Sequence, residues 1–300
     1  MFKKIVVPLD GSKTAEEALE CALDLARFYD GELSLIRVCD VPIQMIETSG
    51  VAYYDLEDTL QKDARAYLEA VSKKQSAAPK ISTKVLTGHT VDQILESAET
   101  YQADLIVLSS HGKSGVERWV LGTVAENVTR RATCPVLLTR GGKKPELPVG
   151  KKILVPLDGS PLAEEVLPLA FAMAKRVHGE LVLLRSFAHA PAHSYEYAGH
   201  DLYPDRQHLE TMRQEPEIAK KYLDETVEEL KTEYTGTEIS QVFSTAHAPE
   251  AILEEARKQE VDLIAMTSHG LTGPGKWIFG SVAANVIQHA PCAVLMKNSR

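Results

Sequence analysis

The sequence predicts an α/β fold made of two tandem five-stranded domains, each a doubly wound parallel sheet. Three observations predict it. The chain contains a long internal repeat, each copy alternates strand-like apolar runs with segments of helical period, and 300 residues suit about two domains. Each half is therefore long enough to close its own hydrophobic core.

The internal repeat can be read directly from the letters. KKIVVPLDGSKTAEEAL at 3–19 returns as KKILVPLDGSPLAEEVL at 151–167. Two later pairs repeat at a spacing about ten residues larger: DLIVLSSHG at 104–112 with DLIAMTSHG at 262–270, and LGTVAENV at 121–128 with FGSVAANV at 279–286. The second copy therefore carries an insertion in its middle.

The segment between the copies, RGGKKPELPVG at 140–150, is rich in glycine, proline and charge. That composition is typical of a short solvated linker. We therefore expect a first domain at 1–140, a linker at 141–150 and a second domain at 151–300.

Each copy begins with a strand that leads into a helix. Residues 5–9 form the continuous apolar run of a parallel strand covered on both faces. Ser12 can cap a helix that stops at Gly31, and Ser160 repeats that cap with a proline at the first helical position. Pro168 lies inside the second helix and should bend it.

The rest of the first copy continues the alternation. Strands are expected at 33–38, 81–86, 105–109 and 136–139, and helices at 56–72, 91–101 and 123–131. Strands that alternate with helices through right-handed crossovers give a mostly parallel sheet with helices on both faces.

Composition excludes several function classes. The net charge of −9 argues against nucleic-acid binding, which needs a clustered basic face. No apolar run approaches the roughly 20 residues that span a bilayer, and the first residues lead into a strand rather than a signal peptide. We expect a cytoplasmic protein. Its four cysteines have no pairing or metal-ligand spacing and are expected to be reduced thiols.

The candidate ligand site lies at the carboxyl ends of the strands, where such sheets bind ligands. Gly122 and Thr123 open a helix whose unpaired N–H groups and dipole suit a phosphate. Asp10 follows the first strand and could accept hydrogen bonds from an exocyclic amine or a ribose hydroxyl. From spacing alone, an N-cap and a strand-to-helix turn explain these residues equally well.

The sequence resembles the universal stress protein family. The resemblance rests on VVPLDGS and LVPLDGS at the first strand of each copy, and on SSHG and TSHG followed after nine residues by GT and GS. It covers both copies except the variable segments near 42–60 and 188–215. It implies the adenine nucleotide alpha-hydrolase-like fold of that family, a stress-response role, and the binding of ATP or AMP through a G-x-x-G-x9-G-[S/T] motif.

The resemblance also implies site residues. In the first copy, Asp10 and Val38 would contact adenine, Gly88 would lie by the ribose, and Gly112, Gly122, Thr123 and Val124 would hold phosphates. Their counterparts are Asp158, Ser186, Ala246, Gly270, Gly280, Ser281 and Val282. Neighbours expected to complete the two sites are Pro8, Leu9, Ser109, His111, Pro156, Leu157 and Thr267.

The two copies match the motif unequally. Ser109 and Thr267 replace its first glycine, and their side chains would crowd the ribose or phosphate path. The second copy departs further, because Ser186 replaces an apolar residue and Ala246 replaces a glycine. We therefore expect the first copy to be the better nucleotide site. Whether magnesium accompanies the nucleotide stays open.

Family members also pair through their last strands. Residues 134–136 and 292–294 occupy matching positions there, and pairing removes the liability of an uncovered apolar edge. We expect the two copies to pair within one chain; a further homodimer stays open.

Three alternatives accompany the nucleotide-binding regulator. The neighbouring Ser110 and His111 do not suit a hydrolase, because adjacent strand residues point to opposite faces. Slow ATP hydrolysis is an alternative, with Lys113 or Lys276 near phosphate, but no Walker motif or base for water is evident. The third is a nucleotide-independent interaction protein.

Four histidines of the insertion, His189, His193, His200 and His208, match no metal pattern, and the segment is expected to be a lid or partner loop.

Overall fold

The structure is a computed structural model. It describes residues 1–40, 53–75, 79–110, 121–140, 149–188, 206–268 and 280–298, with backbone only at 53–55 and 206–214. The first copy and the second copy are named below as in the sequence, residues 1–140 and 151–300.

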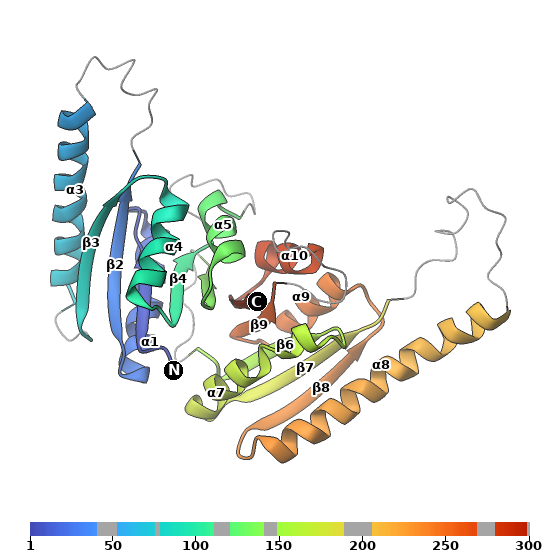
Figure 1. The fold of residues 1–300 in the computed structure, drawn as a ribbon. Helices are drawn as coiled ribbons and strands as arrows, with labels where there is room; N and C mark the ends of the chain where they lie inside the picture. The colour runs from blue at the N-terminus through green and yellow to red at the C-terminus, as the bar shows by residue number, and fades with distance from the viewer. Residues whose placement is uncertain are drawn as a thin grey trace, which may run out of the picture.

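Ten strands within these ranges form one sheet in the order β3-β2-β1-β4-β5-β10-β9-β6-β7-β8 (Figure 1). The strands of the first copy are β1 (Lys4–Pro8), β2 (Glu32–Cys39), β3 (Ile81–Thr87), β4 (Leu105–Ser109) and β5 (Val136–Thr139). Those of the second copy are β6 (Lys152–Leu157), β7 (Glu180–Ser186), β8 (Glu238–Ser244), β9 (Leu263–Thr267) and β10 (Ala293–Lys297). The pairs within each copy are parallel, which confirms the predicted fold class.

Helices cover both faces of the sheet. One face packs against α1 (Lys13–Tyr29), α3 (Tyr53–Lys73), α7 (Leu167–Val177) and α8 (Arg206–Glu233). The other face packs against α4 (Thr90–Tyr101), α5 (Thr123–Arg131), α9 (Ala248–Lys258) and α10 (Ser281–His289). Strand residues alternate between the two faces, so Ile5 and Val7 belong to one core and Val6 belongs to the other. Each core contains residues of both copies.

The predicted helix caps are present at the start of each copy. The Ser12 hydroxyl accepts a hydrogen bond from the Ala15 N–H at 3.2 Å, and the Ser160 hydroxyl accepts one from Ala163 at 3.1 Å. The predicted bend at Pro168 is a break. Helix α6 (Pro161–Glu164) ends and α7 begins at Leu167, because Pro168 has no N–H to donate to the preceding turn.

Helix α1 ends differently from the sequence prediction. The left-handed residue at its C-terminus is Asp30, with φ of 51°, and not Gly31. Gly31 is required for another reason: a Cβ atom there would lie 2.5 Å from the Phe2 carbonyl oxygen. The glycine therefore permits the close approach of β2 to the chain entering β1.

The two copies meet at an antiparallel seam between β5 and β10. Leu137 lies opposite Leu295 in this pairing. The Asn298 side-chain amide donates to the Thr129 and Ala132 carbonyls at the end of α5, both at 2.7 Å. In the reverse direction, the Arg140 guanidinium donates to the Ala290 carbonyl at the end of α10. Each copy thus caps the last turn of a helix of the other copy.

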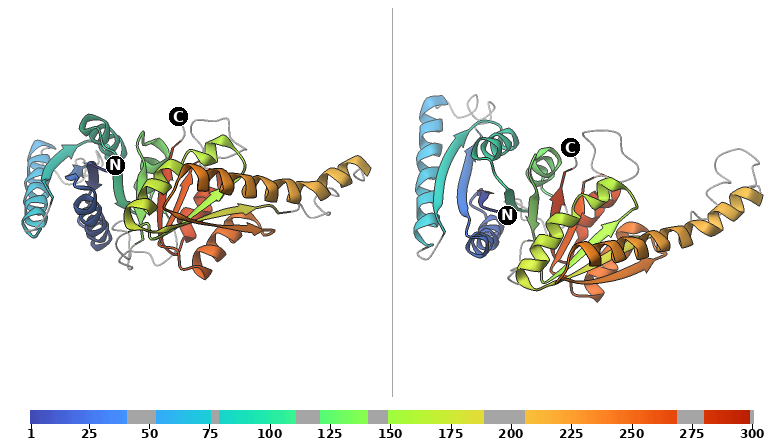
Figure 2. Two further views of the ribbon diagram at one scale, coloured as in Figure 1. Left: turned by 90° about the horizontal axis from the view of Figure 1, so that it is seen from below. Right: turned by 60° about the horizontal axis from the view of Figure 1, so that its bottom comes forward.

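Long helices are not membrane spans here. Within the part of the chain that the structure describes, no helix combines the length and the apolar composition needed to cross a bilayer. Helix α8 extends beyond the body of the second copy (Figure 2).

Candidate nucleotide sites

A cavity of about 400 Å³ opens in the first copy at the carboxyl ends of β1 and β4. The sheet order reverses between these strands, which is where open α/β sheets bind ligands. The volume falls within the roughly 300–1,000 Å³ range of small-molecule sites. The lining residues come from β1, β2, β4 and the first turns of α1, α4 and α5: Pro8, Leu9, Asp10, Ala15, Ile36, Val38, Thr90, Ile94, Leu108, Ser109, Ser110, Gly122, Thr123, Val124 and Ala125.

The start of α5 forms one wall of this cavity. Gly122 is the N-cap residue, in an extended conformation, and no side chain caps the helix. Its own N–H donates to the Ser110 carbonyl at 2.9 Å, which fixes the helix start against the end of β4. The N–H groups of the first turn have no acceptor within the helix and face a site where an anion would be favoured. Glu126 lies in the same turn, 3.8 Å from Arg130, and weakens that preference.

Asp10 is held by its own turn. Its Oδ1 atom accepts a hydrogen bond from the Ser12 N–H at 2.9 Å, the geometry of an Asx turn. Gly11 adopts a φ of 83°, and a Cβ there would lie 2.9 Å from an Arg37 nitrogen. The turn therefore keeps the carboxylate at the end of β1, in the cavity wall.

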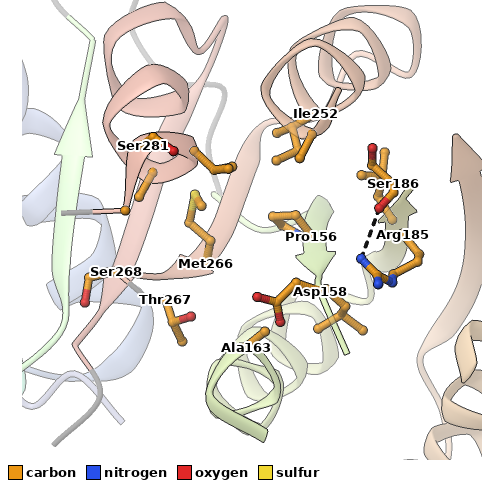
Figure 3. Close-up of a pocket in the computed structure, with 16 residues that line it drawn as sticks. Pro156, Asp158, Ala163, Arg185, Ser186, Ile252, Met266, Thr267, Ser268 and Ser281 are labelled. Atoms are coloured by element: carbon orange, nitrogen blue, oxygen red, sulfur yellow. Dashed lines mark hydrogen bonds between the residues drawn. The ribbon is translucent and has the colours of Figure 1, made fainter. Parts of the chain in front are cut away.

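The equivalent cavity of the second copy has a volume of about 130 Å³. It lies at the ends of β6 and β9 and is bounded by the first turn of α10 (Figure 3). The lining residues occupy matching positions with some different side chains: Pro156, Leu157, Asp158, Ala163, Leu184, Arg185, Ser186, Ala248, Ile252, Met266, Thr267, Ser268, Gly280, Ser281, Val282 and Ala283.

Beside each cavity a tyrosine donates its hydroxyl to a glutamate, a contact that the sequence analysis did not predict. Tyr67 donates its hydroxyl to Glu16 at 3.2 Å, and the Arg37 guanidinium lies 4.7 Å from the centre of the Tyr67 ring. Burial, with the nearby Glu16 carboxylate, raises the pKa of Tyr67 to about 12. In the second copy Tyr222 donates to Glu164 at 2.5 Å. The available signal was in the sequence, since the glutamate and the arginine each recur at the spacing of the first repeat.

Most of the predicted site residues line the two cavities. In the first copy these are Pro8, Leu9, Asp10, Val38, Ser109, Gly122, Thr123 and Val124. In the second copy they are Pro156, Leu157, Asp158, Ser186, Thr267, Gly280, Ser281 and Val282. Gly88 and Ala246 follow β3 and β8 and are not among the lining residues. Ser109 stands in the wall of the larger cavity without filling it.

Comparison with known proteins identifies the family. The Universal stress protein family profile matches residues 1–140 and again residues 150–297. The chain belongs to the universal stress protein family.

Relatives match one copy or the whole chain. A universal stress protein of Methanocaldococcus jannaschii is 38% identical over 146 residues, 48% of this chain and 85% of that protein. One of Mycobacterium bovis is 25% identical over 295 residues, 95% of this chain and 93% of that protein. The crystal structure of a universal stress protein from Archaeoglobus fulgidus, 21% identical, covers 98% of this chain and 96% of its own, with a TM-score of 0.73. These matches confirm a tandem member of the family and its fold.

Part of the universal stress protein motif lies outside the described residues. These motif residues are His111, Gly112 and Gly270. Other residues named from the sequence also lie outside the described ranges: Lys113, Lys276, His189, His193 and His200. Of His208, only the backbone is described, within α8. Across the described ranges, no group of three or more His, Cys, Asp or Glu side chains could hold a metal.

Proposed function

We propose that this universal stress protein binds an adenine nucleotide, ATP or AMP, in the cavity of its first copy, and acts as a non-catalytic stress-response regulator. The observation that carries the proposal is the coincidence of three features in one cavity. The Asp10 carboxylate, the apolar side chain of Val38 and the uncapped start of α5 all line a volume of about 400 Å³. Together they offer a hydrogen-bond acceptor for an amine or a ribose, an apolar wall for a base and an anion site for phosphate.

The chemistry of the lining favours binding over turnover. Efficient phosphoryl transfer needs charge stabilisation on the phosphate and a group that orients the attacking water. Among the described lining residues of the first cavity, Asp10 supplies a carboxylate, and it is engaged in its own turn with Ser12. ATP incubated with an equimolar amount of the protein should therefore release phosphate no faster than ATP in buffer alone. Sustained multiple turnover would favour the slow-ATPase alternative instead.

The direct test is to ask whether nucleotide accompanies the protein. Purified protein is denatured and the released small molecules are separated by ion-exchange chromatography, and ATP and AMP are titrated into the nucleotide-free protein by calorimetry. At a hundredfold excess over the dissociation constant, the ligand should raise the free energy of unfolding by about 2.7 kcal/mol. Neither bound nucleotide nor a change in melting temperature would favour the nucleotide-independent interaction protein.

We further propose that the chain folds as two domains, 1–140 and 151–300 with a linker at 141–150, paired through β5 and β10 in solution. Support comes from the antiparallel seam, which uses the last strand of each copy and both reciprocal helix caps. Because β5 and β10 already pair with each other within one chain, a homodimer would need another surface. Light scattering of the purified chain measures which state is present.

A further inference from the structure

The two cavities have the same walls but very different room. Both lie where their sheet order reverses, and both are bounded by an uncapped helix that starts with glycine. The second has about 130 Å³, against about 400 Å³ in the first. A volume of 130 Å³ lies below the range of sites that enclose small organic ligands.

Arg185 is one difference between the two linings, because its counterpart Arg37 is not among the residues that line the first cavity. The Arg185 Nη1 atom donates a hydrogen bond to the Ser186 carbonyl at 3.0 Å (Figure 3). Its Nε atom is buried and has no hydrogen-bond partner in the structure. In the first copy the matching Arg37 stacks on Tyr67, and β2 contributes only Ile36 and Val38 to the lining.

The arginine also changes the charge of the second cavity. Burial lowers the pKa of Arg185, and the Asp158 carboxylate acts in the opposite direction and favours the charged guanidinium. Asp158 is the counterpart of Asp10, and it also accepts hydrogen bonds from the Ser160 N–H at 2.9 Å and hydroxyl at 2.6 Å. The Ser12 N–H donates to Asp10 in the same way, so the added competitor for a nucleobase amine at Asp158 is the nearby Arg185 guanidinium.

Ser186, which also lines the second cavity, is tied to the segment that follows β8. Its hydroxyl donates to the Ala246 carbonyl and so ties the end of β7 to the residues before α9. The Ala246 N–H in turn donates to the Ser244 hydroxyl at 3.2 Å. Val38, at the matching position of the first copy, has no hydroxyl and cannot make such a tie.

We propose that Arg185 and Ser186 are the residues that exclude adenine nucleotides from the second copy, so that each chain binds one nucleotide. This inference rests on the proposed function of the first cavity. Arg185→Ala would shorten a long side chain of the lining, and Ser186→Val would restore the apolar wall of the first cavity and break the hydrogen bond to the Ala246 carbonyl. The second copy would then gain a nucleotide site.

The test counts bound nucleotides by calorimetric titration with ATP and with AMP. Wild type should bind one per chain, and the Arg185→Ala/Ser186→Val double variant should bind two. Arg185→Met/Ser186→Val keeps the aliphatic packing of the arginine stem and serves as a second opened variant if the alanine variant unfolds. Arg37→Ala is the matched control, since it removes the first-copy arginine, and it should not add a site.

Photolabelling locates each binding event. With 8-azido-ATP and peptide mapping, wild type should be labelled in the first copy, and the opened variants in both copies. Val38→Trp, which fills the first cavity, serves as a background variant. Any nucleotide binding that the opened variants regain in this background belongs to the second copy.

The outcomes separate the two proposals. Wild type that binds two nucleotides, or folded opened variants that still bind one, would overturn the role of Arg185 and Ser186 while leaving the first site intact. No binding by wild type or by either opened variant would overturn the proposed function itself. A single label that maps to the second copy of wild type would contradict both.

Discussion

The two cavities of this chain share their place in the sheet and differ in several of their lining side chains. Strand order, helix positions and the glycine at the start of α5 or α10 are shared by the copies. The volumes nevertheless differ about threefold, about 400 Å³ against about 130 Å³. The duplicated backbone places both cavities at the same edge of the sheet, and we propose that side chains on β7 decide whether a nucleotide fits. Four predictions test this comparison, from the largest expected effect to the smallest.

The largest effect is expected from filling the first cavity. Val38→Trp places a large indole in the apolar wall, so ATP affinity should fall at least about a hundredfold, or about 2.8 kcal/mol. The matched Ser186→Trp change in the second copy should leave ATP affinity unchanged. Calorimetric titration measures both. Equal losses from the two variants would mean that the copies contribute equally.

Removal of the acidic side chain should have a smaller effect. Asp10→Ala removes an acceptor from the proposed site, and ATP affinity should fall about tenfold, since a hydrogen bond to a charged group contributes about 1.5–3 kcal/mol. Asp158→Ala should not alter affinity, because Asp158 lies in the smaller cavity and interacts with the Arg185 guanidinium. A titration in which Asp158→Ala is the weaker binder would reverse the assignment of the sites.

Loss of a side-chain cap at the seam between the copies should lower the free energy of unfolding more than it lowers nucleotide affinity. Asn298→Ala removes two hydrogen bonds to the end of α5 and should lower the free energy of unfolding by about 1–2 kcal/mol. Urea titration followed by circular dichroism measures this loss. Lys221→Ala is the control, because its exposed ion pair with Glu225 is worth little. If Asn298→Ala is as stable as that control, the cap does not hold the seam.

The smallest difference concerns the tyrosines beside the cavities. Tyr222→Phe should cost more stability than Tyr67→Phe, by less than about 1 kcal/mol, because a shorter hydrogen bond to a carboxylate is stronger. The hydroxyl-to-glutamate distances are 2.5 Å for Tyr222 and 3.2 Å for Tyr67. Denaturant titration of the two single variants compares them directly, and the opposite order would contradict the geometry.

The sequence by itself determined the duplicated α/β fold and the outline of both sites. Periods of two kinds, repeated motifs and the caps at Ser12 and Ser160 are local signals, so they are readable without a structure. Asp10 and Thr123, which line the first cavity, were predicted because strand ends and helix starts meet at one edge of a parallel sheet, and Val38 was named through the family resemblance. Helix α7 shows the limit of such signals: Pro168 predicts a bend, and the chain breaks.

Only the tertiary structure decided how much room each cavity has and which residues line it. Arg185 and Arg37 are the same letter at the same repeat position, yet one lines a cavity and the other stacks on Tyr67. Likewise, Asn298 caps a helix that lies 166 to 169 positions earlier in the chain. Side-chain direction and contacts between distant segments depend on packing in three dimensions, and a local sequence pattern carries no information on either.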